Sequence, residues 1–134
     1  MFGGLTSVGG SEGKDGKAYG PVDMDMPQGH VYEMPEEMIL EIVEAYGKAA
    51  LLCKEVGYDM VQVHAAHGWL MSQFLSPVIN TRTDRFGGST ENRARFLMMA
   101  LDAVRRAVGP GFPIEVRFSG DDNVENGMKP EECI

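Results

Sequence analysis

Cysteine, tryptophan and long apolar runs are scarce in this sequence of 134 residues. The two cysteines, Cys53 and Cys133, lie too far apart for a disulfide framework or for the ligand spacing of a zinc site. No apolar run approaches the roughly 20 residues that span a bilayer, and the first residues lack the basic and apolar segments of a secretory signal. We therefore expect a cytoplasmic protein that does not bind a membrane.

Basic residues are also outnumbered, and the formal net charge is −8. An acidic chain repels a phosphate backbone and offers no large basic patch, so nucleic acid is not an expected partner. The balance of 43% hydrophobic and 24% charged residues is typical of a globular protein. Small molecules or other proteins remain the expected partners.

The first part of the chain, residues 1–34, shows no period of 2 or 3.6. Glycine is frequent there, among Ser, Asp, Lys and Pro, which predicts a Gly-rich loop region. The pair Gly9–Gly10 does not form a phosphate-binding loop, because no strand precedes it and no Gly-Lys-Ser/Thr follows it. His30 receives no role from the sequence.

Residues 35–134 carry the periodic segments and are expected to form the core. A helix is predicted over 35–56, because apolar residues recur at helical spacing and Pro35 suits its first turn. A second helix is predicted over 90–108, with Ser89 or Thr90 as its cap. Short strands are predicted over 59–64 and 113–118.

Strands that alternate with helices of this length predict βα units and a parallel sheet. Each strand has one β-branched face and one polar face, the latter carrying Gln62 and His64 or Glu115 and Arg117. A sheet buried on both sides would be apolar on both faces. The pattern therefore favours a (β/α) barrel, in which functional groups lie at the carboxyl ends of the strands.

A loop of more than twenty residues follows the first strand, with a helical turn expected around Leu70–Leu75. Long loops in compact domains are often functional, and this one begins with His64 and His67. From the residues alone, these histidines are loop residues without a role, hydrogen-bond or proton donors, or metal ligands. A third metal ligand is not evident, since His30 is distant in the sequence.

The run GYDMVQVHAAHGWLMSQFLSPVINTRTDRFGGSTENRARF, with PIEVRFSGDD after it, resembles the old yellow enzyme family of NADH:flavin oxidoreductases. This family includes ene-reductases and 2,4-dienoyl-CoA reductase-like proteins. The resemblance is strongest over residues 57–121, and the predicted helix at 35–56 fits the same register. It implies a (β/α)8 TIM barrel with FMN at its carboxyl-terminal mouth and NAD(P)H as the reductant.

The resemblance also implies roles for individual residues. A His-x-x-His or His-x-x-Asn pair ends the family's fourth strand and binds the carbonyl of an enone or similar small-molecule substrate, and His64 and His67 match it. Such donors stabilise the negative charge that develops during hydride transfer. Arg117 matches the family's arginine on the fifth strand, beside the pyrimidine edge of the flavin. These positions imply catalytic roles for the histidines and a cofactor-binding role for Arg117, shared by His64.

One position departs from the family pattern. Members that reduce activated alkenes usually have a tyrosine two residues after the second His or Asn, as the proton donor, and this chain has Trp69. An indole N–H donates a hydrogen bond but is not a practical acid. Trp69 is therefore expected to form a wall of the substrate pocket, and the proton comes from another group or water, or the reaction differs.

The length of the chain is the second departure. A full barrel takes about 250 residues, whereas this chain supplies about two βα units, which resemble those of strands 4 and 5. We therefore expect a fragment of an FMN-dependent NAD(P)H oxidoreductase, inactive by itself, whose partner is the remainder of the barrel. The alternative is a catalytically silent remnant that self-associates as a homo-oligomer or complements a partner.

Overall fold

A computed structural model describes residues 15–133. This part of the chain forms a three-stranded sheet, a two-stranded sheet and three α-helices. The elements in chain order are β1 (Ala18–Gly20), β2 (Met24–Met26), β3 (Gly29–Glu33), α1 (Glu36–Glu55), β4 (Val61–Ala65), α2 (Leu70–Leu75), α3 (Thr90–Val108), β5 (Ile114–Phe118) and the 3-10 helix η2 (Pro130–Cys133).

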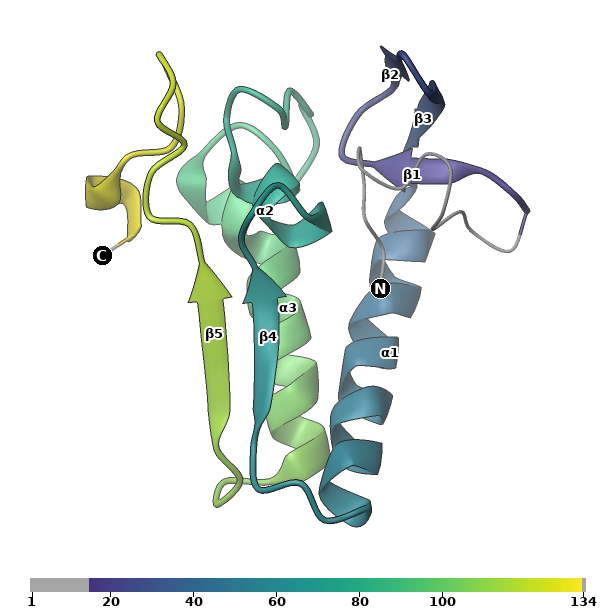
Figure 1. Ribbon diagram of the computed structural model, residues 1–134, viewed down its shortest axis with the longest axis vertical. Coiled ribbons are helices and arrows are strands. Elements are labelled where there is room, and N and C mark those ends of the chain that lie inside the picture. Colours follow the sequence, from purple (N-terminus) through teal and green to yellow (C-terminus); the bar gives the residue numbers. More distant parts are fainter. Residues whose placement is uncertain (1–14, 134) are drawn as a thin grey trace.

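The parallel pair β4–β5 is the centre of the fold, and α1 and α3 both pack behind it (Figure 1). Val63 lies opposite Val116, and His64 lies opposite Arg117. Val63 is buried against the helices, whereas Gln62 is exposed on the other face. The expected one-sided pattern is thus present, although Phe118 is exposed because it ends a strand that has no further neighbour among residues 15–133.

The two long helices follow the sequence expectations closely. α3 has the predicted bounds, and the Ser89 side chain accepts a hydrogen bond from the Asn92 N–H at its start. α1 begins one residue later than expected, because Pro35 is its extended N-cap rather than part of its first turn. The buried residues include, from these helices and β4, Ile39, Ile42, Val43, Ala50, Val63, Phe96, Leu97, Ala100, Val104 and Val108.

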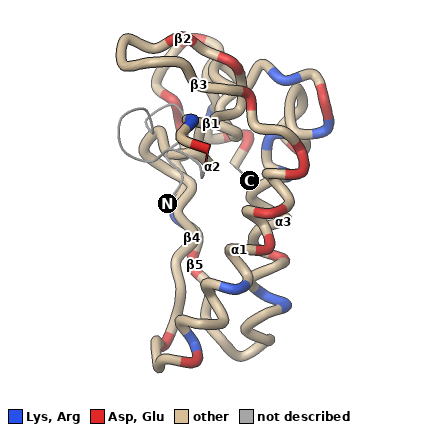
Figure 2. Tube along the Cα trace, turned by 90° about the vertical axis from the view of Figure 1, so that its right-hand side faces the viewer, with Lys and Arg blue, Asp and Glu red and all other residues tan. Residues whose placement is uncertain are grey.

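Strand β4 begins two residues later than the predicted strand and extends to Ala65, so His64 is its penultimate residue. The expected helical turn is present as α2. No helix in the part of the chain that the structure describes is long and apolar enough to cross a membrane. Most charged positions lie along the helices, the connecting loops and the small sheet (Figure 2).

The expectation of a loop over residues 1–34 is wrong for the described portion. Strands β1, β3 and β2 form a small sheet, with β1 and β3 parallel and β2 and β3 antiparallel. Strands of three residues, such as β1 and β2, are too short to leave a clear period in the sequence. Val31 at the centre of this sheet is fully buried. Gly9–Gly10 lies outside the described residues.

The small sheet lies near the carboxyl ends of β4 and β5 (Figure 1), where the segment after α2 anchors it. The buried Arg82 guanidinium donates to the Pro21 carbonyl at 3.0 Å and to the Met34 carbonyl at 2.9 Å. It also binds the carboxylate of Asp84. Asn80, equally buried, donates to the carbonyl of Phe74 in α2 and to the carbonyl of Phe86 further along the loop. The hydrogen bonds of these buried polar groups, rather than a regular helix or strand, hold the loop in place.

Candidate functional site

A tight turn over Ala66–Trp69 places His67 two residues after the end of β4. The Trp69 N–H donates to the Ala66 carbonyl at 3.2 Å. Both central residues have positive φ, 60° at His67 and 73° at Gly68. This combination is rare outside glycine and asparagine, and strained residues of this kind concentrate at functional sites. The turn therefore presents His67 in a conformation that its surroundings must hold.

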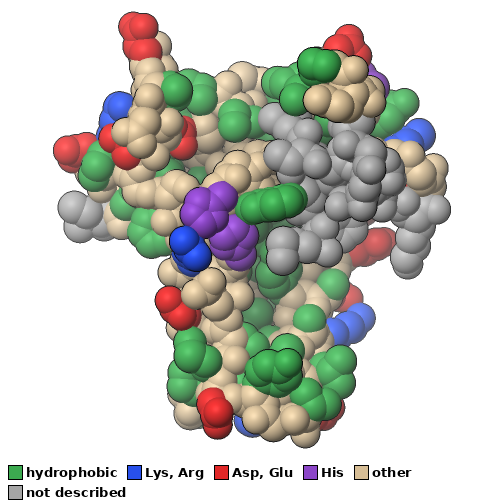
Figure 3. Space-filling view, in the orientation of Figure 1, with side chains coloured by type: hydrophobic (Ala, Val, Ile, Leu, Met, Phe, Trp, Pro, Cys, Tyr) green, Lys and Arg blue, Asp and Glu red, His purple; other side chains and the backbone are tan. Residues whose placement is uncertain are grey.

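His64, His67 and Arg117 meet on the face of the sheet that the helices leave open. The two imidazole rings lie 5.2 Å apart between centroids, and Arg117 Nη2 lies 3.4 Å from His67 Nε2. Parallel register brings this about, since His64 and Arg117 are opposite residues of β4 and β5. Figure 3 shows the imidazoles beside a basic side chain on this face. The structure thus brings together three of the four residues that the sequence nominated.

Arg117 brings a positive charge to the site. Among residues 15–133, Arg117 has no carboxylate within ion-pair distance. Its guanidinium group contacts the His67 ring. Partial burial of His64, together with the neighbouring His67 and the Arg117 cation, lowers the pKa of His64 below its usual range. The cluster consequently offers imidazole and guanidinium N–H groups to an electron-rich ligand.

His64 and His30 should respond to pH in opposite directions. A lowered pKa means that the unfolded chain binds a proton at His64 more readily than the folded chain does. The free energy of unfolding therefore decreases as pH falls below about 6.5. His30 behaves oppositely, because its hydrogen bonds to Asp25 and Asp23 raise its pKa. The stabilisation that protonated His30 gives to the fold is complete below about pH 6.5 and is lost as pH rises through the raised pKa.

NMR titration of the ring protons checks this prediction. We expect the midpoint of His64 to lie below 6.5, the usual value, and that of His30 above it. Arg117→Ala should move the midpoint of His64 upward, because it removes a neighbouring cation. A midpoint for His64 at or above that of His30 would contradict the geometry of the cluster.

Trp69 lies beside the cluster without joining it. It is the extended residue before α2, and 37% of its surface is exposed. Among residues 15–133, no contact between rings joins Trp69 to either histidine. The structure thus places Trp69 at the rim of the site, where it contributes an exposed apolar surface.

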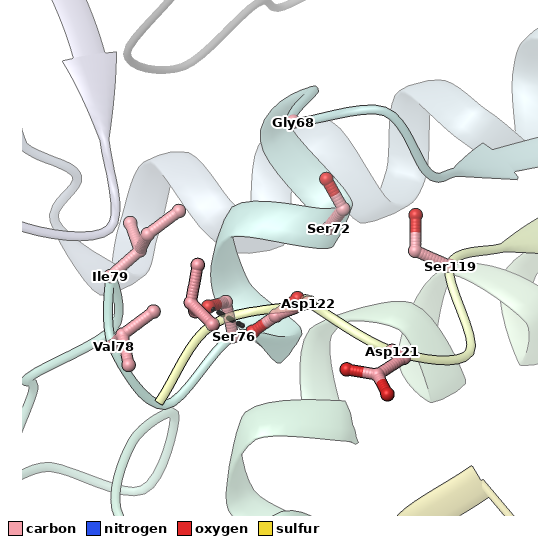
Figure 4. Close-up of a pocket in the computed structure, with 9 residues that line it drawn as sticks. Gly68, Ser72, Ser76, Val78, Ile79, Ser119, Asp121 and Asp122 are labelled. Atoms are coloured by element: carbon pink, nitrogen blue, oxygen red, sulfur yellow. Dashed lines mark hydrogen bonds between the residues drawn. The ribbon is translucent and has the colours of Figure 1, made fainter. Parts of the chain in front are cut away.

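A groove of about 300 Å³ lies next to the turn (Figure 4). It separates the segment around α2 from the residues that follow β5, and its walls include Gly68, Ser72, Ser119 and Val124. Its polar groups already have partners: Ser76 Oγ donates to Asp122 at 2.6 Å, and Ser72 Oγ donates to a backbone carbonyl. The groove beside the histidines therefore combines hydrogen-bonded polar groups with the apolar side chains of Val78, Ile79 and Val124.

Sequence reasoning missed Ser119, whose Oγ accepts a hydrogen bond from the His67 N–H at 3.3 Å. It also missed Gln73, which is fully buried and donates to the Gly68 carbonyl at 2.5 Å. The only available signal was a polar residue inside the otherwise apolar LMSQFL segment. No group of three or more His, Cys, Asp or Glu side chains suited to a metal ion occurs in the described part of the chain.

Comparison with known proteins identifies the family. The profile of the NADH:flavin oxidoreductase / NADH oxidase family matches residues 10–134. The chain belongs to this family. It is 42% identical over 116 residues to an NADPH dehydrogenase of Bacillus velezensis, a match covering 85% of this chain. It is 38% identical over 127 residues to an NADH oxidase of Thermoanaerobacter brockii, covering 95% of this chain.

Solved structures of oxidoreductases share the fold of this chain. A 2-naphthoyl-CoA reductase in complex with 2-naphthoyl-CoA matches 94% of this chain with a TM-score of 0.83 and 37% identity. Morphinone reductase in complex with tetrahydroNAD matches 88% with a TM-score of 0.74 and 32% identity. These neighbours are TIM-barrel enzymes, of which this chain resembles an α/β portion with few strands.

The match covers a minor part of each relative. The chain spans 34% of the Bacillus enzyme and 20% of the Thermoanaerobacter enzyme. It spans 20% and 37% of the two solved structures.

The oxidoreductase family uses FMN with NAD(P)H as the reductant, and the cluster suits such a cofactor. An arginine cation without a carboxylate partner among residues 15–133, beside two imidazoles, can donate hydrogen bonds to carbonyl oxygens such as those of a flavin.

Proposed function

We propose that this chain is part of an FMN-dependent NAD(P)H oxidoreductase that reduces an α,β-unsaturated carbonyl or a related acceptor. The observation that supports this is the meeting of His64, His67 and Arg117 on one open face, at the carboxyl ends of parallel strands. Barrel enzymes place their chemistry at those ends. The family membership supplies the cofactor and the reductant.

Each residue of the cluster has a separate task in this proposal. His64 and His67 hold the carbonyl oxygen of the acceptor with two N–H donors, which stabilise the charge that develops there. Arg117 holds the pyrimidine edge of the cofactor and compensates its negative charge. Trp69 forms a wall of the acceptor pocket. FMN, when bound, supplies the hydride, and the protein orients the acceptor and excludes water.

The proposal also assigns the chain its place in the fold. We infer that it contributes two βα units, resembling strands 4 and 5 of a (β/α)8 barrel, and that the remainder of the barrel is its partner. Neither strand of the β4–β5 pair has a second neighbour among the described residues. Apolar residues of the α1 region are also exposed, with Leu52 at 59% and Val56 at 64%. Unpaired edges and apolar surface of this kind favour association with further strands and helices.

The first test is an FMN titration of the purified chain, followed by flavin fluorescence. We expect weak binding or none, and no turnover of NAD(P)H, because residues 15–133 supply only β4 and β5 of the proposed barrel. Oxidation of NADH by this chain in the presence of FMN would contradict the proposal that it is inactive alone.

The second test uses a chimeric enzyme, in which this chain replaces the matching stretch of the Bacillus velezensis NADPH dehydrogenase. Arg117→Ala should raise its Kd for FMN about tenfold to a hundredfold, because hydrogen bonds to charged groups contribute about 1.5–3 kcal/mol. Arg106→Ala is the matched control, since Arg106 is exposed in the last turn of α3. Equal Kd values for the two variants would remove Arg117 from the flavin site.

The second candidate function is a catalytically silent module that pairs with copies of itself or with a partner. The free edges of β4 and β5 and the exposed apolar residues of α1 favour it for the isolated chain. Size-exclusion chromatography with light scattering tests this candidate. A discrete oligomer supports a self-associating module, and polydisperse soluble aggregates support an incomplete barrel.

A further inference from the structure

The second histidine of the cluster owes its position to a strained backbone. His67 has φ of 60°, a value that non-glycine residues adopt rarely, and Gly68 follows at 73°. Residues in such conformations persist only where their surroundings over-determine them. The single hydrogen bond that closes the turn, from the Trp69 N–H to the Ala66 carbonyl, is local and joins only the ends of the turn.

Gln73 holds the turn from the side of α2. Its side chain is 1% exposed, and Nε2 donates to the Gly68 carbonyl at 2.5 Å. Burial of the Gln73 side chain excludes water from its amide, so this hydrogen bond is costly to lose. Gln73 thus fixes the peptide group that directly follows Gly68.

Ser119 holds the same turn from the opposite side. Its Oγ accepts a hydrogen bond from the His67 N–H at 3.3 Å, across 52 positions of sequence. Ser119 follows β5 directly and lies two residues after Arg117. A single segment therefore places both the guanidinium near the His67 ring and the hydroxyl at the His67 backbone.

We propose that Gln73 and Ser119 are positioning residues, which lock the Ala66–Trp69 turn from two sides and thereby aim the His67 ring at the acceptor. The inference rests on the proposed function, in which His67 binds that acceptor. Loss of either side-chain hydrogen bond frees the strained turn to relax. The His67 ring then leaves His64 and Arg117, and one donor of the acceptor site is lost.

The experiment is NMR of the histidine rings in the full chain, as Ser119→Ala, Gln73→Met and the conservative Ser119→Thr. Ser119→Ala and Gln73→Met should lose the nuclear Overhauser contact between the His64 and His67 rings, which are 5.2 Å apart between centroids. The midpoint of His64 should move upward, because His67 lowers the pKa of His64. Ser119→Thr keeps the hydroxyl and should retain both signals. His30 lies in β3 and should titrate unchanged as the internal reference.

Persistence of the ring contact and of the His64 midpoint in folded Ser119→Ala and Gln73→Met would overturn the proposal. If Gln73→Met does not fold, Ser119→Ala decides, because Ser119 is only half-buried. If the separate chain gives no resolved spectrum, the chimeric enzyme decides. There Ser119→Ala should lower acceptor reduction at least about tenfold while Ser119→Thr restores it, since misplacement by about 1 Å costs up to about a hundredfold. Equal rates for Ser119→Ala and the parent would reject the positioning role.

The two proposals fail in different ways. Unchanged acceptor reduction in His67→Ala would reject the role of His67 and hence the proposed function. Unchanged ring geometry in Ser119→Ala would reject only the positioning role, because the ring contact is measured without cofactor or acceptor.

Discussion

Replacing His67 by alanine in the chimeric enzyme is expected to lower the rate of enone reduction about a hundredfold to a thousandfold. Removal of one preorganised donor from an oxyanion site typically has an effect of this size. His67 is placed for this role because its ring lies 5.2 Å from that of His64, on the open face of the sheet. Stopped-flow measurement of enone reduction by the NADPH-reduced enzyme gives the rate directly.

Three controls make this result specific. Reaction with dioxygen should change little, because dioxygen has no carbonyl for His67 to polarise. His67→Asn should retain most of the rate, since an amide also donates a hydrogen bond. His30→Ala should have no effect, because His30 lies in β3 and contacts Asp23 and Asp25 instead. Equal losses for enone and dioxygen would point to a damaged fold rather than a missing donor.

Replacing Arg82 by methionine is expected to lower the free energy of unfolding by about 3–5 kcal/mol. The Arg82 side chain is 4% exposed, and it satisfies the carbonyls of Pro21 and Met34 together with the Asp84 carboxylate. Methionine would leave the buried carbonyls of Pro21 and Met34 without this donor, and each buried acceptor left unsatisfied costs about 1–3 kcal/mol. Urea denaturation followed by circular dichroism measures the change.

Arg85→Met is the matched control for Arg82→Met. Arg85 lies three residues away, and its ion pair with Glu36 is about half exposed on both sides. Exposed pairs contribute at most about 1 kcal/mol, so this variant should unfold close to the parent. A similar loss in both variants would show that Arg82 contributes only as a surface charge. In Arg82→Met, we also expect proteolysis to cleave the small sheet before the rest of the fold.

The long helices and the strand pair were predictable because their signals are local. Helix α3 has the expected bounds, and α1 differs from the expected helix by one residue at each end. The apolar spacing of these segments reflects one buried face, which any packing of the fold must satisfy. The alternation of Gln62 and Val63 likewise predicted an open polar face, and the structure has it.

The small sheet and the long loop were not predictable in the same way. Strands β1 and β2 have three residues each, too few for a period, and their partner β3 defines them by hydrogen bonds. The order of the loop depends on Arg82, whose carbonyl partners Pro21 and Met34 lie 61 and 48 positions away. Arg93 similarly reaches Glu132 from the start of α3.

The sequence by itself determined which residues could form the site, because His64, His67 and Arg117 stand at strand ends within a recognisable family pattern. Only the tertiary structure decided how they meet. Parallel register sets His64 opposite Arg117, and a strained turn held by Gln73 and Ser119 brings His67 beside them. The physical reason is that hydrophobic periodicity reports which residues are buried, whereas register and strained conformations depend on contacts between segments that are distant in the sequence.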